Sequence, residues 1–503
     1  MYSAVQRSSQ MRERYDAKDM RRQRRAGTGR GGAVSIIAAL TAGFALRAVF
    51  IAHHPRFAGD ALIYGELAHN LLAHHVYALM DDVLHGTLIR LPGYPLFLAL
   101  CFKLLGDANY LAVLWVQAAI DVATCGLVAA LVHRLAGRRA ALCALWLSAL
   151  CPFTANYAAV ALAETCSLFC VALAFFALQR WIAARRTQGR TWLWVVLIGF
   201  ALAWAVLLRP DEGLLAAAVV PVMLWAGWRS GASPEIKRTV VKSTVVKRLA
   251  PALVASLFVL LPLSLWATRN WRVFHVFQPL SPHYANDPDE EVPYGFMRWY
   301  RTWAIGFPST VKVYWTYDGS PVDRHDLPAR AFDSPAQRAQ TAALYAQYNQ
   351  DQSSTPAVDA GFARLAAERV AAHPLRYYVL LPVARELDMW FRPRTELLKI
   401  PLDWWRIREH PRASAVAIAF ALLNAAYLAL ALAGLLRWRR AQWSGYATLA
   451  CAMGIFFVLR CALLLTIDNS EMRYTLECFP VLLVAGGLAF MSGRIDVETI
   501  SKR

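Results

Sequence analysis

The sequence predicts an all-α polytopic membrane protein with about ten transmembrane helices, external juxtamembrane helices and a small external segment. Apolar residues make up 57% of the 503 residues, and the mean hydropathy is +0.35. Charged residues make up only 17%, against roughly 25% in soluble domains. Basic residues are concentrated in every second loop between long apolar stretches. Because such a chain cannot bury its apolar surface in water-soluble domains, the bilayer must be its solvent.

The chain begins with a polar segment, residues 1–32, which we predict to be a basic cytoplasmic tail. Nine Lys and Arg residues precede residue 31. The apolar stretch 33–53 follows and is long enough to span a bilayer. A cleaved signal peptide is the alternative, but the stretch is long and lacks a clear small-x-small cleavage site. We therefore expect an uncleaved first transmembrane helix.

Nine further apolar stretches complete the predicted set of ten spans. They are 109–133, 140–153, 157–179, 193–208, 213–228, 249–267, 413–436, 443–467 and 476–493. The predicted span 140–153 is short and ends at Pro152. We divide the chain into a transmembrane core, 33–268, the C-terminal transmembrane helices, 413–493, and a cytoplasmic tail, 494–503.

The charge of the loops predicts their sides of the membrane. Four loops are basic, carrying Arg134, Arg138 and Arg139; Arg180, Arg185, Arg186 and Arg190; Arg229, Lys237, Arg238, Lys242, Lys247 and Arg248; and Arg437, Arg439 and Arg440. The alternate loops are acidic or balanced. The positive-inside rule places the basic set and both termini in the cytoplasm. The net charge of +19 thus reflects topology, and no nucleic-acid partner is expected.

Two segments on the opposite side are too long to be simple connectors. The first, 54–108, ends in the apolar piece 93–106, which is too short to span and suits an interfacial helix. The second, 269–412, is rich in Trp, Tyr and Pro and should form a small external (periplasmic) layer. Its stretch 377–391 mixes apolar and charged positions, as expected of a second interfacial helix.

The polar residues that suggest chemistry gather at the external ends of the spans. Asp60 follows the first span and shares a helical face with Tyr64, with Glu66 close by. Arg90 precedes the rigid turn Pro92–Pro95. The alternative to a functional role is that Asp60 is an ordinary helix-start carboxylate. For Arg90, the alternative is that it anchors the chain at the membrane surface.

Further candidates lie at the ends of later spans. They are Glu164, Arg209, Arg269, Asn270, Arg473 and Tyr474. A carboxylate at membrane depth is costly and usually faces a cavity. Single interfacial arginines are normally anchors, but three on one face among carboxylates suit an anion site. For Asp121, which lies one turn after Gln117, we expect a structural polar pair.

The order of these motifs resembles the GT-C membrane glycosyltransferases, in particular the protein O-mannosyltransferase and aminoarabinose-transferase clan. The motifs are Gly59-Asp60 with Tyr64, Arg90-Leu-Pro-Gly-Tyr-Pro95, Ala163-Glu164, Arg209-Pro210, Arg269-Asn270 and Arg473-Tyr474. The similarity covers about 33–290 and again 460–490. Each motif is short, but their order and shared side make the set fairly specific.

The resemblance implies a GT-C fold and transfer of a sugar from a polyprenyl-phosphate lipid to an unknown glycan, lipid or protein acceptor outside the cytoplasm. It implies that Asp60 is the general base and that Arg90 and Arg269 bind the donor phosphate. Many relatives carry a second carboxylate after the aspartate, where this chain has Ala61. No cofactor or metal site is therefore assigned, although a divalent metal is not excluded. None of the nine cysteines forms Cys-x-x-Cys, so no zinc site is expected.

The residues support the same chemistry without the resemblance. A site on the outer face has no access to cytoplasmic nucleotide sugars, so the activated sugar must arrive on a carrier that crosses the bilayer. A carboxylate to take the acceptor proton and arginines to hold a leaving phosphate are the minimum requirement. A membrane transporter or lipid flippase without glycosyl transfer is the alternative, and a non-catalytic scaffold is a third. No internal repeat, which would favour a transporter, is found.

Overall fold

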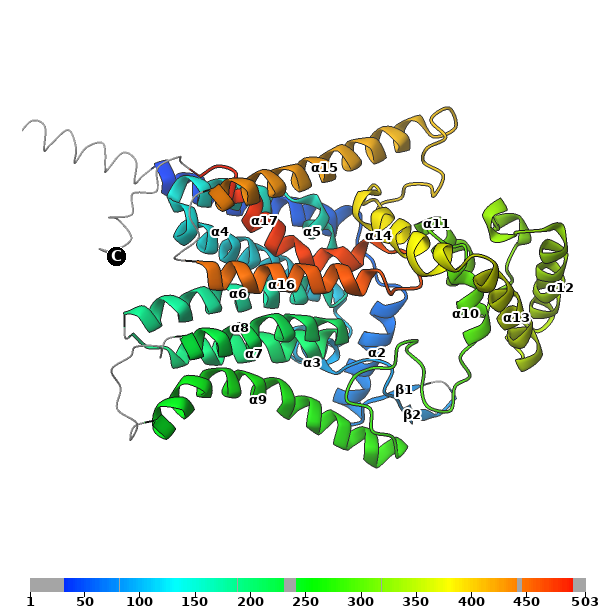
Figure 1. Ribbon diagram of the computed structural model, residues 1–503, viewed down its shortest axis with the longest axis horizontal. Helices are drawn as coiled ribbons and strands as arrows, with labels where there is room; N and C mark the ends of the chain where they lie inside the picture. The colour runs from blue at the N-terminus through cyan, green and yellow to red at the C-terminus, as the bar shows by residue number, and fades with distance from the viewer. Residues whose placement is uncertain are drawn as a thin grey trace, which may run out of the picture.

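The computed structural model describes residues 31–80, 82–187, 189–229, 241–317, 319–440 and 446–491. Most of the predicted tail 1–32, all of the tail 494–503, and the basic residues Lys237 and Arg238 lie outside these residues. The described chain is a bundle of helices with one two-stranded hairpin, and a helical layer lies at one end of the bundle (Figure 1). The predicted all-α membrane class is confirmed.

The bundle is built from long apolar helices, and two of the connections between them are long folded segments. The helices are the first one, Gly31–His53, then α4 (Tyr110–Ala149), α6 (Glu164–Arg186), α7 (Trp192–Leu208), α8 (Gly213–Arg229), α9 (Val241–Phe274), α15 (Pro411–Arg440), α16 (Ala447–Leu464) and α17 (Phe479–Leu488). In the described residues, seven helices are long and apolar enough to cross a membrane. The predicted count of ten is not confirmed.

The difference in the count has three local causes. The predicted spans 109–133 and 140–153 are counted together as α4, although its backbone leaves the helical conformation at Gly137, where φ is 81°, in the predicted loop between them. A glycine adopts this left-handed conformation without a Cβ clash. Helix α7 has 17 residues, and the last predicted span is divided into a 3-10 segment, Met472–Cys478, and the ten-residue α17. Apolar composition alone does not reveal the short length of α7 or the 3-10 segment before α17.

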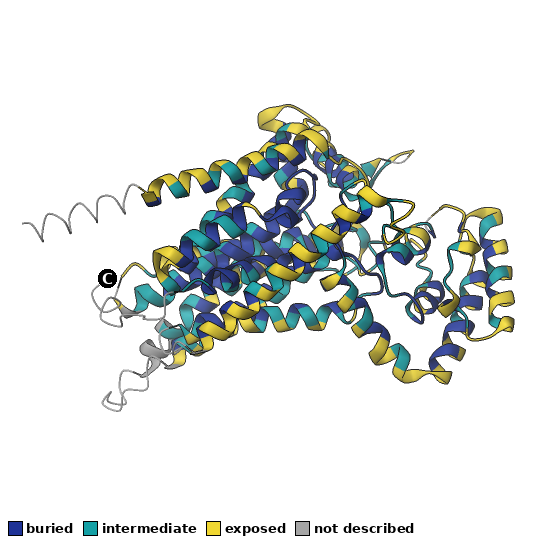
Figure 2. Ribbon diagram, turned by 90° about the horizontal axis from the view of Figure 1, so that it is seen from above, coloured by how far each residue is buried: buried dark blue, intermediate teal, exposed yellow. Residues whose placement is uncertain are grey.

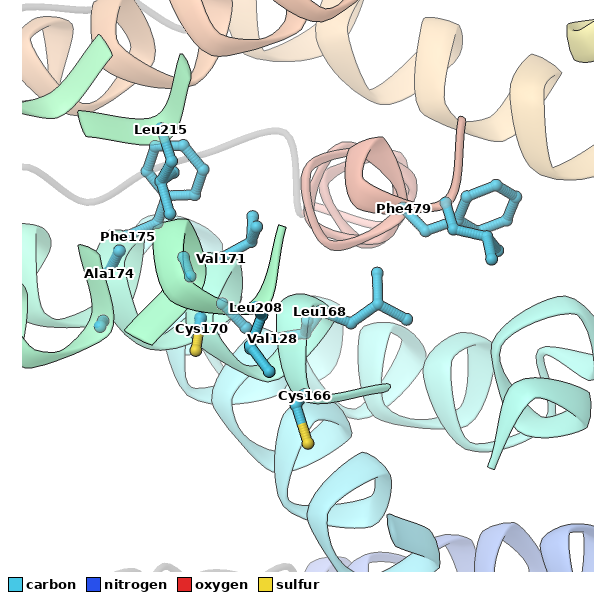
Figure 3. Close-up of a cluster of buried hydrophobic side chains, with 14 of the residues drawn as sticks. Val128, Cys166, Leu168, Cys170, Val171, Ala174, Phe175, Leu208, Leu215 and Phe479 are labelled. Atoms are coloured by element: carbon cyan, nitrogen blue, oxygen red, sulfur yellow. The ribbon is translucent and has the colours of Figure 1, made fainter. Parts of the chain in front are cut away.

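Helix α6 forms the centre of the bundle. Buried side chains of α6, among them Cys166, Val171 and Phe175, pack with Val128 of α4 and Leu215 of α8 (Figure 3). In α6, 67% of the most apolar window is buried, compared with 17% in α9. Exposed residues lie mainly on the outer helices (Figure 2). The exposed leucines of α9 therefore suit contact with lipid.

The segment 54–108 folds beside one end of the bundle. It contains α2 (Asp60–Ala73), the antiparallel strands β1 (Ala78–Met80) and β2 (Leu84–Gly86), and α3 (Gly93–Leu105). Gly93 lies so close to the backbone of Leu207 in α7 that a Cβ would clash, with 2.4 Å to the nearest atom. The Pro-Gly-Tyr-Pro turn thus fixes α3 against the bundle.

The layer at the end of the bundle has its own aromatic core. It contains α10 (Tyr294–Arg301), α11 (Phe307–Ser309), α12 (Pro335–Asp351), α13 (Pro356–Ala372) and α14 (Leu381–Phe391), and the π-helical turns Thr310–Tyr314 and Arg376–Leu380. Short 3-10 turns of this layer cover 324–326 and 329–331. In the bundle, a 3-10 turn covers 210–212 between α7 and α8, and the short helix α5 spans Pro152–Tyr157 between α4 and α6. Phe296, Trp299, Tyr345 and Phe362 pack together in this layer. Burying such large rings gives it a core separate from that of the bundle.

Candidate active site

Asp60 is the first residue of α2 and lies between two arginines. Its Oδ1 is 2.7 Å from Nη2 of Arg90, and its Oδ2 is 3.2 Å from Nη1 of Arg473. The preceding Gly59 has φ 59°, a left-handed value that disfavours any L side chain, so the chain turns sharply into the helix here. The helix N-terminus further favours a negative charge at this position. About a quarter of the Asp60 side chain (28%) stays exposed.

The electrostatics of this group keep the carboxyl ionised. Burial by itself would raise the pKa of Asp60, but the charges of Arg473 and Arg90 and their hydrogen bonds outweigh it and lower the pKa to about 2. The charge of Asp60 likewise raises the pKa of Arg90, and the charges of Glu471, Tyr474 and Asp60 raise that of Arg473, against the opposing effect of burial. Arg473 Nε also contacts Glu471 at 2.7 Å. Because Asp60 is paired with both arginines, it is a weak base.

Glu164 extends the cluster toward the bundle. The predicted span 157–179 begins only at Glu164, because the chain turns after α5, and so Glu164 lies in the first turn of α6. Its Oε1 is 3.0 Å from Nη1 of Arg209 and 3.9 Å from Nη1 of Arg473. Glu164 is 3% exposed, so this carboxylate links two arginines at the ends of different spans.

Two tyrosines surround the ion pairs. The ring of Tyr474 lies beneath Arg473 and Arg209, with centroid distances of 5.5 and 5.9 Å, and its hydroxyl donates to Glu471 at 2.7 Å. Tyr64 stacks edge-on against Tyr94 at 5.1 Å. Burial, followed by the nearby charge of Asp60, raises the pKa of Tyr64 to about 12. Both tyrosines therefore remain neutral walls of the site at neutral pH.

A second group of charges supports Arg209, and its two fully buried members, Arg460 and Glu477, were missed in the sequence. Arg460 of α16 contacts Asp211 at 2.6 Å and Glu477 at 2.8 Å, and neither Arg460 nor Glu477 is exposed. Arg209 contacts the same two carboxylates at 3.1 and 3.4 Å. The signal was present, because Arg460 and Glu477 are charges inside apolar stretches, where charges are costly and mark functional regions.

Other predicted site residues lie apart from Asp60. Arg269 of α9 donates to the carbonyl oxygens of Thr87 and Tyr77 at 2.7 and 2.8 Å, which ties the hairpin segment to α9. Asn270 donates to the carbonyl of Gln278 at 2.7 Å. Glu66 accepts from the backbone N–H of Met80. These contacts favour a positioning role, and phosphate binding by Arg269 stays a prediction.

Asp121 has a different partner from the one expected. Its Oδ2 is 2.6 Å from Nη2 of Arg47 in the first helix. Gln117 instead accepts from the Tyr94 hydroxyl at 2.6 Å and donates to the carbonyl of Val160 at 2.7 Å. The Asp121–Gln117 pair is therefore wrong. The reason is that side chains one turn apart on α4 each find a closer partner on a neighbouring element.

The geometry is suited to an anion. Arg90, Arg209 and Arg473 converge from three separate segments, and a phosphate could replace the carboxylates that now neutralise them. Among the described residues, a group with metal-ligand geometry occurs at Asp403, Glu409 and His410, in the segment before α15. None of these three residues contacts the Asp60 cluster, and all three already take part in ion pairs among themselves and with Arg406.

Comparison with known proteins gives one family and several solved structures. Residues 90–266, about a third of the chain, match the family model described as dolichyl-phosphate-mannose-protein mannosyltransferase. Among curated proteins, no sequence matches this chain. The structure is similar to the archaeal oligosaccharyltransferase AglB of Archaeoglobus fulgidus in complex with an inhibitory peptide and a dolichol-phosphate, with 12% identity and a TM-score of 0.46.

That likeness covers 91% of this chain and 50% of the AglB chain, so this chain spans half the length of AglB. A second similar structure is ArnT from Cupriavidus metallidurans bound to undecaprenyl phosphate, with 16% identity, a TM-score of 0.39, and coverage of 91% of this chain and 77% of ArnT. The matched segment 90–266 contains Arg90, Glu164 and Arg209 of the cluster. By this family match and its ordered motifs, the chain resembles the GT-C membrane glycosyltransferases of the protein O-mannosyltransferase and aminoarabinose-transferase clan.

Proposed function

We propose that this protein is an integral-membrane glycosyltransferase that moves a sugar from a polyprenyl-phosphate lipid to an acceptor hydroxyl on the outer face of the membrane. One observation carries the proposal: the Asp60 carboxylate lies between Arg90 and Arg473, at 2.7 and 3.2 Å. A base and two phosphate ligands thus lie within one cluster. The family description names a lipid-phosphate sugar, which supports this class of donor.

The proposed reaction assigns each charge of the cluster a role. The donor phosphate attracts Arg90 and Arg473 away from Asp60, and the loss of these partners raises the basicity of the carboxylate. Asp60 takes the proton of the acceptor hydroxyl while the oxygen of that hydroxyl bonds to the anomeric carbon of the sugar. The bond from that carbon to the phosphate oxygen breaks, and the polyprenyl phosphate leaves as an anion held by the arginines.

The neighbouring residues position the donor phosphate and the acceptor and contribute to their binding. Arg209 is the third cation near the phosphate, and the carboxylates of Glu164, Asp211 and Glu477 hold its guanidinium in place. Tyr64 and Tyr474 form the sides of the site. The acceptor, whether glycan, lipid or protein, would reach Asp60 past the small residues Gly59 and Ala61.

A transfer assay with purified protein in proteoliposomes tests the proposal. Radiolabelled polyprenyl-phosphate sugars are supplied with a crude acceptor fraction of glycans, lipids and proteins. We expect label in an acceptor together with an equal amount of released polyprenyl phosphate. Movement of intact labelled donor across the bilayer, with no bond cleavage for any sugar, would instead identify a flippase.

We further propose an inner-membrane location with both termini in the cytoplasm and the site facing the periplasm or exterior. In Figure 1 the C-terminal ends of α8 and α15 and the N-terminal end of α9 lie at one end of the bundle, and α2 and the helical layer lie at the other. In a cysteine-free background, single cysteines at positions 20 and 240 should resist an impermeant maleimide in intact cells, and one at position 330 should react. A protected position 330 that reacts only after permeabilisation would place the site on the wrong side for a lipid donor.

A further inference from the structure

A cavity lies outside the Asp60 cluster. It has a volume of about 590 Å³ and is lined by Arg298 and Arg301 of α10, Tyr377 and Tyr378 before α14, and Ala462 and Leu465 at the end of α16. This volume is within the range of small-molecule sites. No residue of the Asp60 cluster lines it, so the proposed sugar transfer does not account for it.

The polar side of the cavity carries excess positive charge. Arg298 is exposed, and no hydrogen bond or ion pair joins its side chain to another described residue. Arg301 is 3.1 Å from Asp468 and lies over the Tyr377 ring at 5.6 Å. Two cations therefore face the cavity against one carboxylate, which is also held by the hydroxyl of Tyr284 at 3.0 Å.

A third arginine lies behind this pair. Arg385 of α14 is 1% exposed, and its Nε and Nη2 have no hydrogen-bond partner. Its Nη1 donates to the carbonyl oxygens of Arg301 and Ala304. Burial, and then the like charge of Arg301, lower the pKa of Arg385 to about 10, so it remains charged at neutral pH. The local field thus favours an anion.

The opposite side of the cavity is apolar and belongs to the membrane-facing part of the molecule. Ala462 and Leu465 lie at the end of the candidate span α16. Val379 and Val383 line the other wall, and on the same helical segment Leu380 and Leu387 expose 57% and 51% of their surface. Figure 1 shows α14 beside the end of α16. A ligand here meets cations at one end and hydrocarbon at the other.

We propose that this cavity binds an acidic glycerophospholipid of the surrounding bilayer. The phosphate lies at Arg298 and Arg301, and the acyl chains run along Ala462, Leu465 and Val383. Tyrosines at the rim suit the boundary between head group and hydrocarbon. The bound lipid would also brace the segment that starts at Leu465 and leads to Arg473 of the Asp60 cluster. The proposal does not depend on the proposed transfer reaction.

Native mass spectrometry of the full-length detergent-purified protein tests this site. Phosphatidylglycerol and phosphatidylcholine of identical acyl chains are titrated separately. We expect phosphatidylglycerol to bind at least about 5-fold more tightly, and Arg298→Glu to remove that preference. Arg298 has no internal partner, so the variant should fold. The matched control is Arg364→Glu on α13, an exposed arginine outside the cavity, which should retain the preference.

Three outcomes would overturn the proposal. The first is an equal affinity for the two lipids, and the second is an equal loss of preference in the two variants. The third is full competition by millimolar glycerol 3-phosphate, because a soluble phosphate that displaces the lipid without acyl chains would mean that the cavity takes a free phosphate ester. Failure of sugar transfer in the proteoliposome assay, with lipid preference intact, would leave this site standing and reject only the proposed function.

Discussion

Replacing Asp60 by Asn is expected to lower sugar transfer by at least about two orders of magnitude. Asparagine keeps the shape of the side chain but cannot take the proton from the hydroxyl group of the acceptor. A positioned general base contributes roughly 10²–10⁴ in rate. Donor binding should be unchanged or tighter, because Arg90 and Arg473 lose the carboxylate that now occupies them at 2.7 and 3.2 Å. Single-turnover transfer and equilibrium donor binding separate the two effects.

The matched control is Glu66→Gln, which removes the nearest other carboxylate of α2. Glu66 accepts from the backbone of Met80 and makes no contact with the arginines of the cluster, so transfer should change little. An Asp60→Asn protein that retains more than a tenth of the transfer rate would show that the base is elsewhere. Glu164, which is paired with Arg209 at 3.0 Å, would then be the next residue to test.

The membrane class and most helix positions were predictable because apolar length and loop charge are local properties. The break at Gly137 falls in the predicted basic loop between the spans 109–133 and 140–153. The breaks within predicted spans were not predictable: the span 157–179 begins as a helix only at Glu164, seven residues after the end of α5, and the span 476–493 begins in a 3-10 segment. Both features depend on how the neighbouring elements pack.

The site was predictable to the level of residue types at one end of the spans. The pairing of Asp60 with Arg473 was not predictable, because Arg473 is 413 positions away in the sequence and meets Asp60 only through the packing of the last two helices. Arg460 and Glu477 could have been found, since each interrupts an apolar stretch. Their partners are set by contacts between α16, the turn at Pro210–Glu212 and the segment before α17.

Replacing Arg473 by Ala is expected to weaken donor binding by about 10- to 150-fold, the equivalent of about 1.5–3 kcal/mol for a charge-assisted contact shielded from water. Arg473→Lys should restore binding only in part, because an ammonium lacks the planar fork of donors. Arg269→Ala is the matched comparison. Its guanidinium contacts Thr87 and Tyr77, so we expect faster proteolysis of the segment 77–87 and a smaller change in donor affinity.

The same Arg473 variant should move the pH dependence of transfer. A carboxylate with a depressed pKa stays ionised down to that value, and the stabilisation it provides is present above its unfolded pKa and lost as the pH falls through the folded value of about 2. Without Arg473 the pKa of Asp60 rises toward its usual range, so the acid limb of kcat/KM should move to higher pH, toward about 4. Arg473→Lys keeps the charge and should hold the limb at low pH. If Arg473→Ala lost donor affinity while its limb coincided with that of the unaltered protein, Asp60 would not be the group that must be ionised, because Arg473 contacts its carboxylate directly.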